Sequence, residues 1–361
     1  MRSIVRKSVL DVTPYLPGKP IEEVKRELGL KDVIKLASNE SPFSPSLKVL
    51  ETITRAARDL NRYPDGGCYH LRQALSHRLG VAGNQIIFGN GSDEIIVMAV
   101  RAFVDKGDEV ILARPSFLIY EIASKIAGAQ MKAVPLKDFR YDLSGMKKTV
   151  TKKTKIIFIG NPDNPASTYI TQKEVVDFLQ EIRRDILVFF DEAYFEFVDE
   201  KDYPDTVKFL KTYKNIIVSR TFSKMYGLAG LRIGYGIANP ELIDLLNRVR
   251  EPFNVNSLAQ AAALACLKDS KYYEDIKTKV NAQKRYLCEE FKNLGLKFVE
   301  GVTNFILVDV GRNSRGLSEA LLKKGVIIRD MNFWGLKNFI RVTIGTQKEN
   351  QKFIHVLKEV L

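Results

Sequence analysis

Short, continuous apolar runs alternate with segments of helical periodicity through the middle of this chain, and this alternation constrains its fold most strongly. The runs are rich in Ile, Val and Phe and lack the polar alternation of a sheet with one solvated face. Strands of this kind, separated by helices, favour a mostly parallel sheet covered by helices on both sides. We therefore predict strands at 85–88, 109–113, 155–159, 186–190, 215–219 and 233–236, with helices at 93–104 and 171–183.

The pattern changes beyond residue 250, and this change suggests a second domain. A helical stretch at 257–293 precedes predicted strands at 297–299, 304–308, 326–329 and 340–343 and a helix at 318–324. We expect an α/β domain at 47–250 and a smaller α+β domain at 251–361. Residues 1–46 contain five prolines and little periodicity beyond 21–28, so we expect an arm that forms part of the small domain or contacts a partner.

Composition excludes several classes of protein. A chain of 361 residues with 45% hydrophobic side chains can bury a full core, and its three scattered cysteines suggest neither a disulfide framework nor a zinc site. No apolar run is long enough to cross a bilayer, and no secretory signal follows the basic N-terminus, so a cytoplasmic location is expected. The net charge of +13 is interpreted as a solvated, lysine-rich surface, with neither nucleic acid nor membrane as a partner.

Ligands of open α/β sheets bind at the carboxyl ends of the strands, so the residues after each apolar run are the candidates for function. Gly89 and Gly91 lie between a predicted strand and a predicted helix, where backbone N–H groups and the helix dipole can face an anion. A dinucleotide-binding motif would need a third glycine at position 94, which is Glu94. A cradle for a single phosphate and a simple tight turn both remain open.

Three charged residues follow strands in the same way. Asp191 ends one apolar run, Lys224 follows the next, and Arg232 lies eight residues further on. Each alone has an ordinary explanation: a strand-end cap, a surface lysine, or one member of an ion pair. Together they meet the requirements of pyridoxal 5′-phosphate, because a lysine amine can bind its aldehyde, a carboxylate can keep its pyridine nitrogen protonated, and an arginine can bind its phosphate.

The segment 219–235, Ser-Arg-Thr-Phe-Ser-Lys-Met-Tyr-Gly-Leu-Ala-Gly-Leu-Arg-Ile-Gly-Tyr, resembles the lysine motif of fold-type I aminotransferases. Within the class II aminotransferases of this fold type, the chain resembles the histidinol-phosphate aminotransferase subfamily. Its motifs have the same order and spacing as those of that subfamily. The matching segments are 14–20, 35–40, 62–65, 89–94, 191–194, 328–330 and 340–346. The resemblance implies a large domain with a mostly parallel sheet, a smaller α+β domain, and transamination between L-histidinol phosphate and 2-oxoglutarate in histidine biosynthesis.

The resemblance also implies a role for each matching residue. The catalytic residues would be Lys224, which forms a Schiff base with the cofactor and moves a proton, Asp191 at the pyridine nitrogen, and Tyr194. The other residues implied to bind pyridoxal 5′-phosphate are Ser92, Asp93, Phe117, Asn164, Thr221, Ser223, Arg232 and, from the neighbouring subunit of a homodimer with shared sites, Tyr63. The residues implied to face the small-molecule substrates are Tyr15, Asn39, Arg329 and Arg341. No metal is implied.

Two segments depart from the family pattern. Asn164-Pro165-Ala166-Ser167 replaces Asn-Pro-Thr-Gly, and Pro42-Phe43-Ser44-Pro45 replaces Pro-Tyr-Gly-Pro. Three alternative functions therefore remain: an aromatic or broad-range aminotransferase, a phosphothreonine decarboxylase, and a binding protein that retains the fold.

Overall fold

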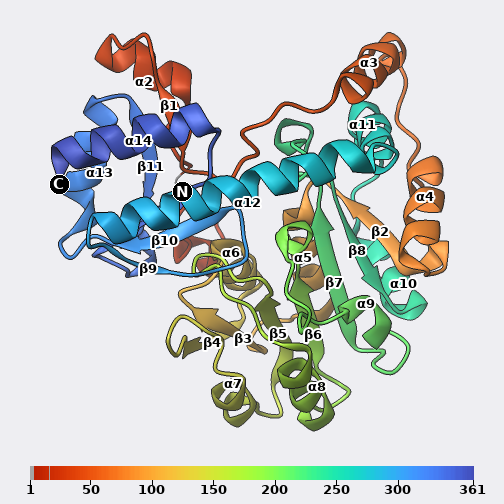
Figure 1. The fold of residues 1–361 in the computed structure, drawn as a ribbon. Coiled ribbons are helices and arrows are strands. Elements are labelled where there is room, and N and C mark those ends of the chain that lie inside the picture. The colour runs from red at the N-terminus through yellow and green to blue at the C-terminus, as the bar shows by residue number, and fades with distance from the viewer. Residues whose placement is uncertain (1–3, 16) are drawn as a thin grey trace.

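The computed structural model describes residues 4–15 and 17–361, and it contains two β-sheets (Figure 1). Residues 1–3 and Leu16 of the 14–20 motif lie outside the described residues. The larger sheet has seven strands in the order β2-β8-β7-β6-β5-β3-β4. These strands are β2 (Ile86–Gly89), β3 (Glu109–Arg114), β4 (Gln130–Pro135), β5 (Thr154–Gly160), β6 (Leu187–Asp191), β7 (Ile216–Thr221) and β8 (Gly234–Ala238).

All neighbouring strands of the larger sheet pair in parallel except those that flank β8, which runs antiparallel to both β7 and β2. Alternate side chains enter different cores: Ile157 and Ile159 pack on one face of the sheet and Phe158 on the other. Helices cover both faces, and the mostly parallel, helix-flanked sheet expected from the apolar runs is confirmed.

The helices of the N-terminal part and the larger sheet are α1 (Lys7–Leu10), α2 (Ile21–Leu28), α3 (Leu47–Ala56), α4 (Tyr69–Leu79), α5 (Ser92–Phe103), α6 (Leu118–Ala127), α7 (Leu143–Thr149), α8 (Gln172–Glu181), α9 (Thr206–Phe209) and α10 (Pro240–Val249). The N-terminus of α8 has the capping box expected from its sequence, with Thr171 and Glu174 exchanging hydrogen bonds. None of the helices in the described part of the chain is long and apolar enough to cross a membrane.

The smaller sheet has five strands in the order β1-β11-β12-β10-β9. These strands are β1 (Ile34–Leu36), β9 (Lys297–Val299), β10 (Phe305–Asp309), β11 (Val326–Asp330) and β12 (Phe339–Thr343). β1 comes from the N-terminal segment and pairs in parallel with β11, so both ends of the chain contribute to this sheet. The helices after residue 250 are α11 (Ser257–Leu267), α12 (Ser270–Asn293), α13 (Ser314–Lys323) and α14 (Gln347–Val360).

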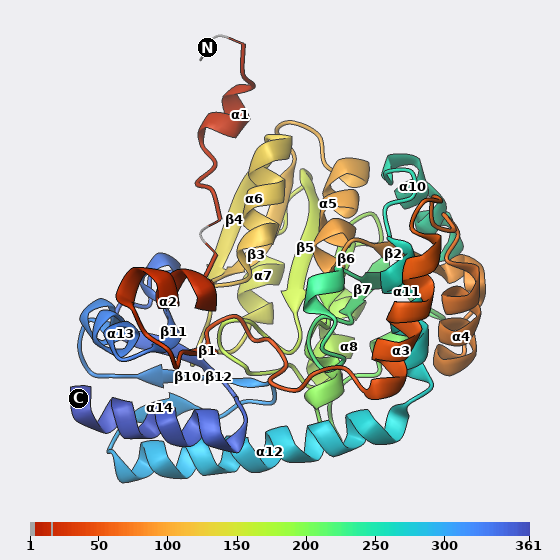
Figure 2. The ribbon, with the colours of Figure 1, turned by 90° about the horizontal axis from the view of Figure 1, so that it is seen from above.

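Helix α12 runs along both parts of the molecule (Figures 1 and 2). Near its start Tyr273 packs edge-on against Tyr226 beside the larger sheet, with ring centroids 4.9 Å apart. In its second half Lys284 donates a hydrogen bond to the carbonyl of Gly301, in the segment between β9 and β10. The predicted single helical stretch 257–293 is interrupted at Lys268 and Asp269, which separate α11 from α12.

Candidate active site

A cavity of about 390 Å³ opens at the carboxyl ends of β6 and β7, where the larger sheet faces the smaller one. It is lined by most of the residues that the sequence predicts for the site. These are Tyr15, Asn39, Ser92, Asp93, Phe117, Asn164, Asp191, Tyr194, Thr221, Ser223, Lys224, Arg232 and Arg341. Tyr63 and Arg329 do not line it.

Asp191 is the last residue of β6 and is fully enclosed between neighbouring strands. Its carboxylate accepts hydrogen bonds from Tyr120 Oη at 2.8 Å and Ser219 Oγ at 3.2 Å. Burial raises the pKa of this carboxyl to about 6, and the two hydroxyl donors oppose that rise by stabilising the charged form. The carboxylate therefore lies at the cavity wall in a fixed orientation.

Lys224 lies three residues after β7, in the turn that leads to Gly227. Its Nζ donates a hydrogen bond to the carbonyl of Ser38 at 3.3 Å and lies 5.6 Å from the ring centroid of Tyr194. Burial, and then the positive charge of Arg341, lower the pKa of the amine to about 8. A larger fraction of this amine is therefore uncharged near neutral pH than for a solvated lysine, which makes it a better nucleophile.

Groups that can bind an anion lie together where α5 begins next to β8. Arg232 has a left-handed backbone with φ of 56°, and its guanidinium lies 3.4 Å from Asp93 and 3.5 Å from Ser223 Oγ. A Cβ on Gly91 would lie 2.5 Å from Arg232 Nη2, and one on Gly234 would lie 2.5 Å from the amide nitrogen of Ser92. Only glycine at these two positions allows Arg232 and the start of α5 to pack this closely, so the guanidinium and the first amides of α5 lie near enough to bind one anion together.

The opposite wall is a polar network between the two sheets. Arg341 Nη1 donates to Asn164 Oδ1 at 2.5 Å, and Asn164 Nδ2 in turn donates to Tyr194 Oη at 3.3 Å. Asn39 Nδ2 donates to the same hydroxyl at 2.9 Å. Because Arg341 is buried on β12 and Asn164 follows β5, this network fixes the guanidinium at the edge of the cavity.

The unusual loop 164–167 adopts a backbone that suits the glycine usually found at its end. Ser167 has φ of 69°, in the left-handed region. Its Oγ lies 2.6 Å from Thr303 Oγ1 and accepts a hydrogen bond from the amide of Thr303 at 3.1 Å. The side chain therefore gains two contacts with the segment before β10 that glycine would lack.

Two predicted residues lie elsewhere. Tyr63 is 83% exposed on the protein surface and stacks on Phe253, with ring centroids 4.8 Å apart. Arg329 is the neighbour of Arg341 in the antiparallel pairing of β11 with β12, but it lines a separate outer cavity of about 580 Å³. Its guanidinium carbon lies 5.7 Å from the ring centroid of Tyr15.

Tyr120 and Trp334 are among the residues that line the site but that sequence reasoning did not assign to it. Tyr120 lies three residues after Phe117, one turn along α6, so helical spacing could have suggested that both rings face the same cavity. Trp334 belongs to no motif, and no sequence signal marked it.

The comparisons with known proteins agree with this geometry. Residues 31–357 match the family model described as aminotransferase class I and II. The chain belongs to the class I and II aminotransferases. This aminotransferase is 46% identical to a histidinol-phosphate aminotransferase of Moorella thermoacetica over 99% of this chain and 92% of that protein. It is 44% identical to the Caldicellulosiruptor saccharolyticus protein of the same name, over 99% of both chains.

Solved structures show the same relationship. The aminotransferase superposes on the crystal structure of histidinol-phosphate aminotransferase from Sinorhizobium meliloti in complex with pyridoxal-5′-phosphate with a TM-score of 0.91 and 29% identity, covering 99% of this chain and 97% of that chain. An aspartate aminotransferase of Thermus thermophilus shares the fold, with a TM-score of 0.86 at 22% identity. The fold class inferred from the lysine motif is therefore confirmed.

Proposed function

We propose that this protein transfers an amino group between L-histidinol phosphate and 2-oxoglutarate in histidine biosynthesis, with pyridoxal 5′-phosphate as cofactor. The observation that carries the proposal is that Lys224, Asp191 and Arg232 line one cavity at the strand ends. Nearly full-length similarity to proteins named histidinol-phosphate aminotransferase supports the substrate.

The cavity has the donors that this cofactor requires. The guanidinium of Arg232, packed against Gly91, and the first residue of α5, Ser92, both line the cavity and suit a phosphate group. Phe117, on the loop before α6, offers a ring face on which a pyridine can stack. Asp191 would hold the proton on the pyridine nitrogen, and Tyr194 and Asn164 would hydrogen-bond the phenolic oxygen of the ring.

The cofactor, when bound, supplies an electron sink for negative charge on the carbon next to the reacting nitrogen. Lys224 Nζ would hold its aldehyde and then move the proton of the substrate carbon, a role that suits an amine with a pKa of about 8. Arg341 would bind the glutamate carboxylate through its planar fork, held in place by Asn164 at 2.5 Å. The remaining candidates for substrate contact are Tyr15, Asn39 and Arg329.

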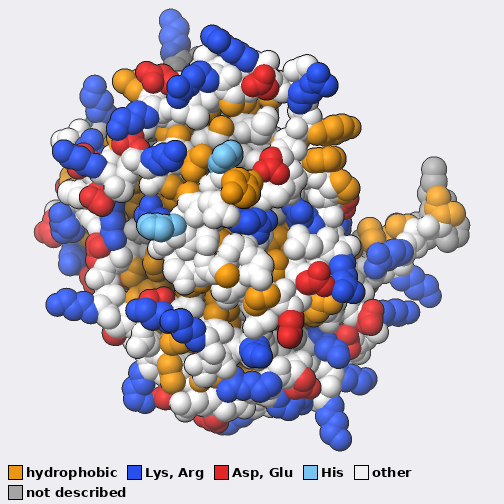
Figure 3. Space-filling view, turned by 90° about the vertical axis from the view of Figure 1, so that its right-hand side faces the viewer, with side chains coloured by type: hydrophobic (Ala, Val, Ile, Leu, Met, Phe, Trp, Pro, Cys, Tyr) orange, Lys and Arg blue, Asp and Glu red, His pale blue; other side chains and the backbone are white. Residues whose placement is uncertain are grey.

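We extend the proposal to a homodimer with shared sites. Tyr63 is exposed and stacks on Phe253, which is also exposed. Leu47, Leu60 and Tyr69, which are near Tyr63 in the sequence, are exposed large hydrophobic residues as well. The face shown in Figure 3 has hydrophobic side chains spread among basic and acidic ones. A second copy seated on the surface that carries Tyr63 and Phe253 would cover these exposed side chains and bring Tyr63 to the cofactor phosphate of its partner.

The substrate is tested by a transamination assay with 2-oxoglutarate and three amino compounds: histidinol phosphate, phenylalanine and phosphothreonine. We expect the highest kcat/KM for histidinol phosphate. A higher value for phenylalanine would favour a broad-range aminotransferase, and release of carbon dioxide from phosphothreonine would favour the decarboxylase.

The shared site is tested by mixing two variants that should each be impaired, Tyr63→Phe and Lys224→Ala. In a mixed dimer one of the two sites retains both groups, so part of the activity should return on mixing. Full activity in a dilute monomer would refute the shared site.

A further inference from the structure

Trp334 is the only tryptophan of the chain, and it occupies the short turn η5 (Asn332–Trp334) between β11 and β12. These two strands carry Arg329 and Arg341. The turn ends at Gly335, whose φ of 79° lets the chain reverse into β12. The indole is therefore attached to the same hairpin as both arginines.

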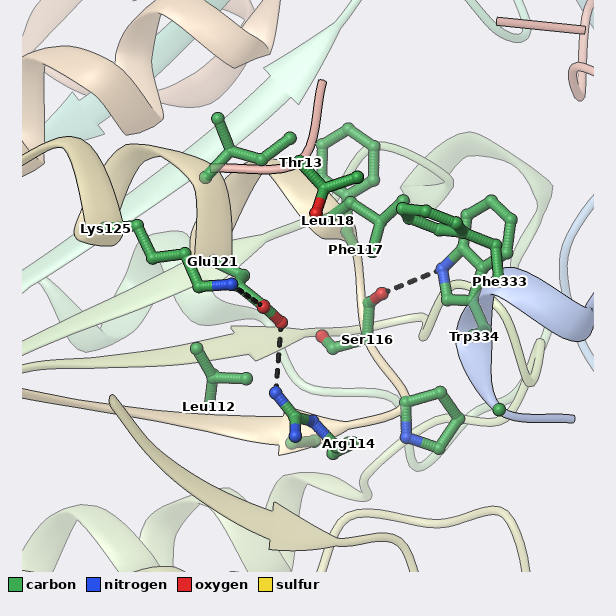
Figure 4. Close-up of a pocket in the computed structure, with 14 residues that line it drawn as sticks. Thr13, Leu112, Arg114, Ser116, Phe117, Leu118, Glu121, Lys125, Phe333 and Trp334 are labelled. Atoms are coloured by element: carbon green, nitrogen blue, oxygen red, sulfur yellow. Dashed lines mark hydrogen bonds and ion pairs between the residues drawn. The ribbon is translucent and has the colours of Figure 1, made fainter. Parts of the chain in front are cut away.

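The indole edge is bonded to the larger sheet. Trp334 Nε1 donates a hydrogen bond to the carbonyl of Ser116 at 3.1 Å, in the loop between β3 and α6 (Figure 4). Ser116 immediately precedes Phe117, the ring that lines the active-site cavity. This bond fixes the position of the indole across the gap between the two sheets.

The indole face lies against both guanidinium groups. The guanidinium carbon of Arg329 lies 4.9 Å from the ring centroid of Trp334, and that of Arg341 lies 6.0 Å from it. Both distances are within the range in which an aromatic face attracts a cation. Two like charges that repel one another are thus held beside a single ring.

Trp334 is also the wall shared by three cavities in the described part of the chain. It lines the active-site cavity, the outer cavity that contains Arg329, and a third cavity of about 340 Å³. The third cavity has an apolar wall that includes Leu118 and Phe333, and at its other end Glu121 pairs with Arg114 at 3.1 Å and Lys125 at 2.7 Å (Figure 4).

We propose that Trp334 determines substrate specificity by holding Arg329 and Arg341 for an anionic substrate and by separating the active site from the third cavity, which is drawn in Figure 4. The proposal rests on the proposed function for the identity of the phosphorylated substrate. With a shorter side chain at position 334, the two guanidinium groups lose the aromatic ring that contacts both of them. The third cavity, whose wall includes Leu118 and Phe333, then opens into the active site. An uncharged aromatic amino donor gains space where the phosphorylated one loses a contact.

The first experiment compares Trp334→Ala with Trp334→Phe, which retains a ring face but lacks the N–H group. For Trp334→Ala we expect kcat/KM for histidinol phosphate to fall about 10- to 30-fold, while that for phenylalanine stays within about threefold or rises. Trp334→Phe should keep the ratio of the two values within about threefold of wild type. Equal losses for both substrates in Trp334→Ala would show a merely structural role and overturn the proposal.

The second experiment needs no turnover, so it separates this proposal from the substrate assignment. Because Trp334 is the only tryptophan, the intrinsic fluorescence of the holoenzyme reports on this position. We expect inorganic phosphate to change its emission saturably, and potassium chloride at equal ionic strength to leave it unchanged. The response should be lost in Arg329→Gln. An emission that phosphate does not alter would overturn the proposal even if histidinol phosphate is the preferred substrate.

Discussion

Asp191 and Lys224 lie on one side of the cavity, whereas Arg341 lies on the other side, with Arg329 in the outer cavity beside it. The two pairs of residues are held in place by different kinds of structure. Asp191 ends a strand whose neighbours pair with it on both sides, and Lys224 follows the next strand, so the backbone of a buried parallel sheet fixes both. Arg341 and Arg329 lie on an antiparallel pair of strands and depend on side-chain contacts, those of Arg341 with Asn164 after β5 and those of Arg329 with Trp334 in the turn between the two strands.

This difference in structure suggests that the two pairs of residues have different functions. Under the proposed function, Asp191 and Lys224 would act on every amino donor, whereas Arg341 and Arg329 would each contact only one part of a substrate. Substitutions on the first side should therefore reduce activity toward every substrate, and substitutions on the second should change the ratio between substrates.

The largest effect is expected for Lys224→Ala. Loss of the amine removes both the covalent anchor and the proton-transfer group, so turnover of all substrates should fall by at least about 10³-fold, together with the visible absorption of the bound cofactor. The control is Lys211→Ala, an exposed lysine. Steady-state kinetics and absorption spectra measure both. A coloured, active Lys224→Ala enzyme would contradict the assignment.

Asp191→Asn should cause the second-largest loss of activity. A neutral amide cannot keep the pyridine nitrogen protonated, so we expect kcat to fall roughly 10²- to 10⁴-fold for histidinol phosphate and phenylalanine alike, with the cofactor retained. The matched control is Asp309→Asn, which alters an aspartate at the end of β10 outside the cavity. Near-normal turnover would mean that Asp191 serves only as a strand cap.

Arg329→Ala tests whether the antiparallel strands determine the choice between substrates. Loss of one charge-assisted contact should lower kcat/KM for histidinol phosphate by about 10- to 150-fold and leave phenylalanine nearly unaffected. Arg315→Ala, in the same outer cavity, is the control for general loss of positive charge. If both substrates suffer equally, Arg329 does not contact the phosphate and the broad-range function gains support.

The smallest expected effect is on stability, and it concerns Asp163 in the loop after β5. Burial raises the pKa of Asp163 from 3.8 to about 7, so the folded protein binds this proton more tightly than the unfolded chain does. Its stabilising contribution is complete at low pH and is lost as the pH rises through about 7. Asp163→Asn cannot lose a proton, so its free energy of unfolding relative to wild type should rise by roughly 2 kcal/mol between pH 5 and pH 8.

Urea unfolding of both proteins at the two pH values measures this difference. Asp191, whose pKa is also raised, is present in both proteins, so its contribution cancels. Parallel stability curves for the two proteins would show that Asp163 does not titrate in this range.

The sequence predicted the positions of Asp191 and Lys224 better than those of the residues on the antiparallel strands, and the reasons are physical. The strands that lead to Asp191 and Lys224 are buried on both faces, so their apolar runs mark them and their ends within one or two residues. The edge strand β4 (Gln130–Pro135) was missed because it is mostly solvated and has no such run. Tyr120 and Trp334 were missed because their roles depend on contacts with distant segments. Arg329 was assigned to the site by resemblance, and the structure places it in the outer cavity beside the site.

The continuous helix α12 has a practical consequence for dividing this protein. A chain cut after residue 250 would leave all 24 residues of α12 on the smaller fragment, including Tyr273, whose ring packs on Tyr226 of the larger one. Ile276 and Val280, buried on the same helix, would be exposed near the start of that fragment. The two halves should consequently fail as separately expressed proteins and remain soluble only when they are produced together, so a split reporter built on this fold needs its break elsewhere.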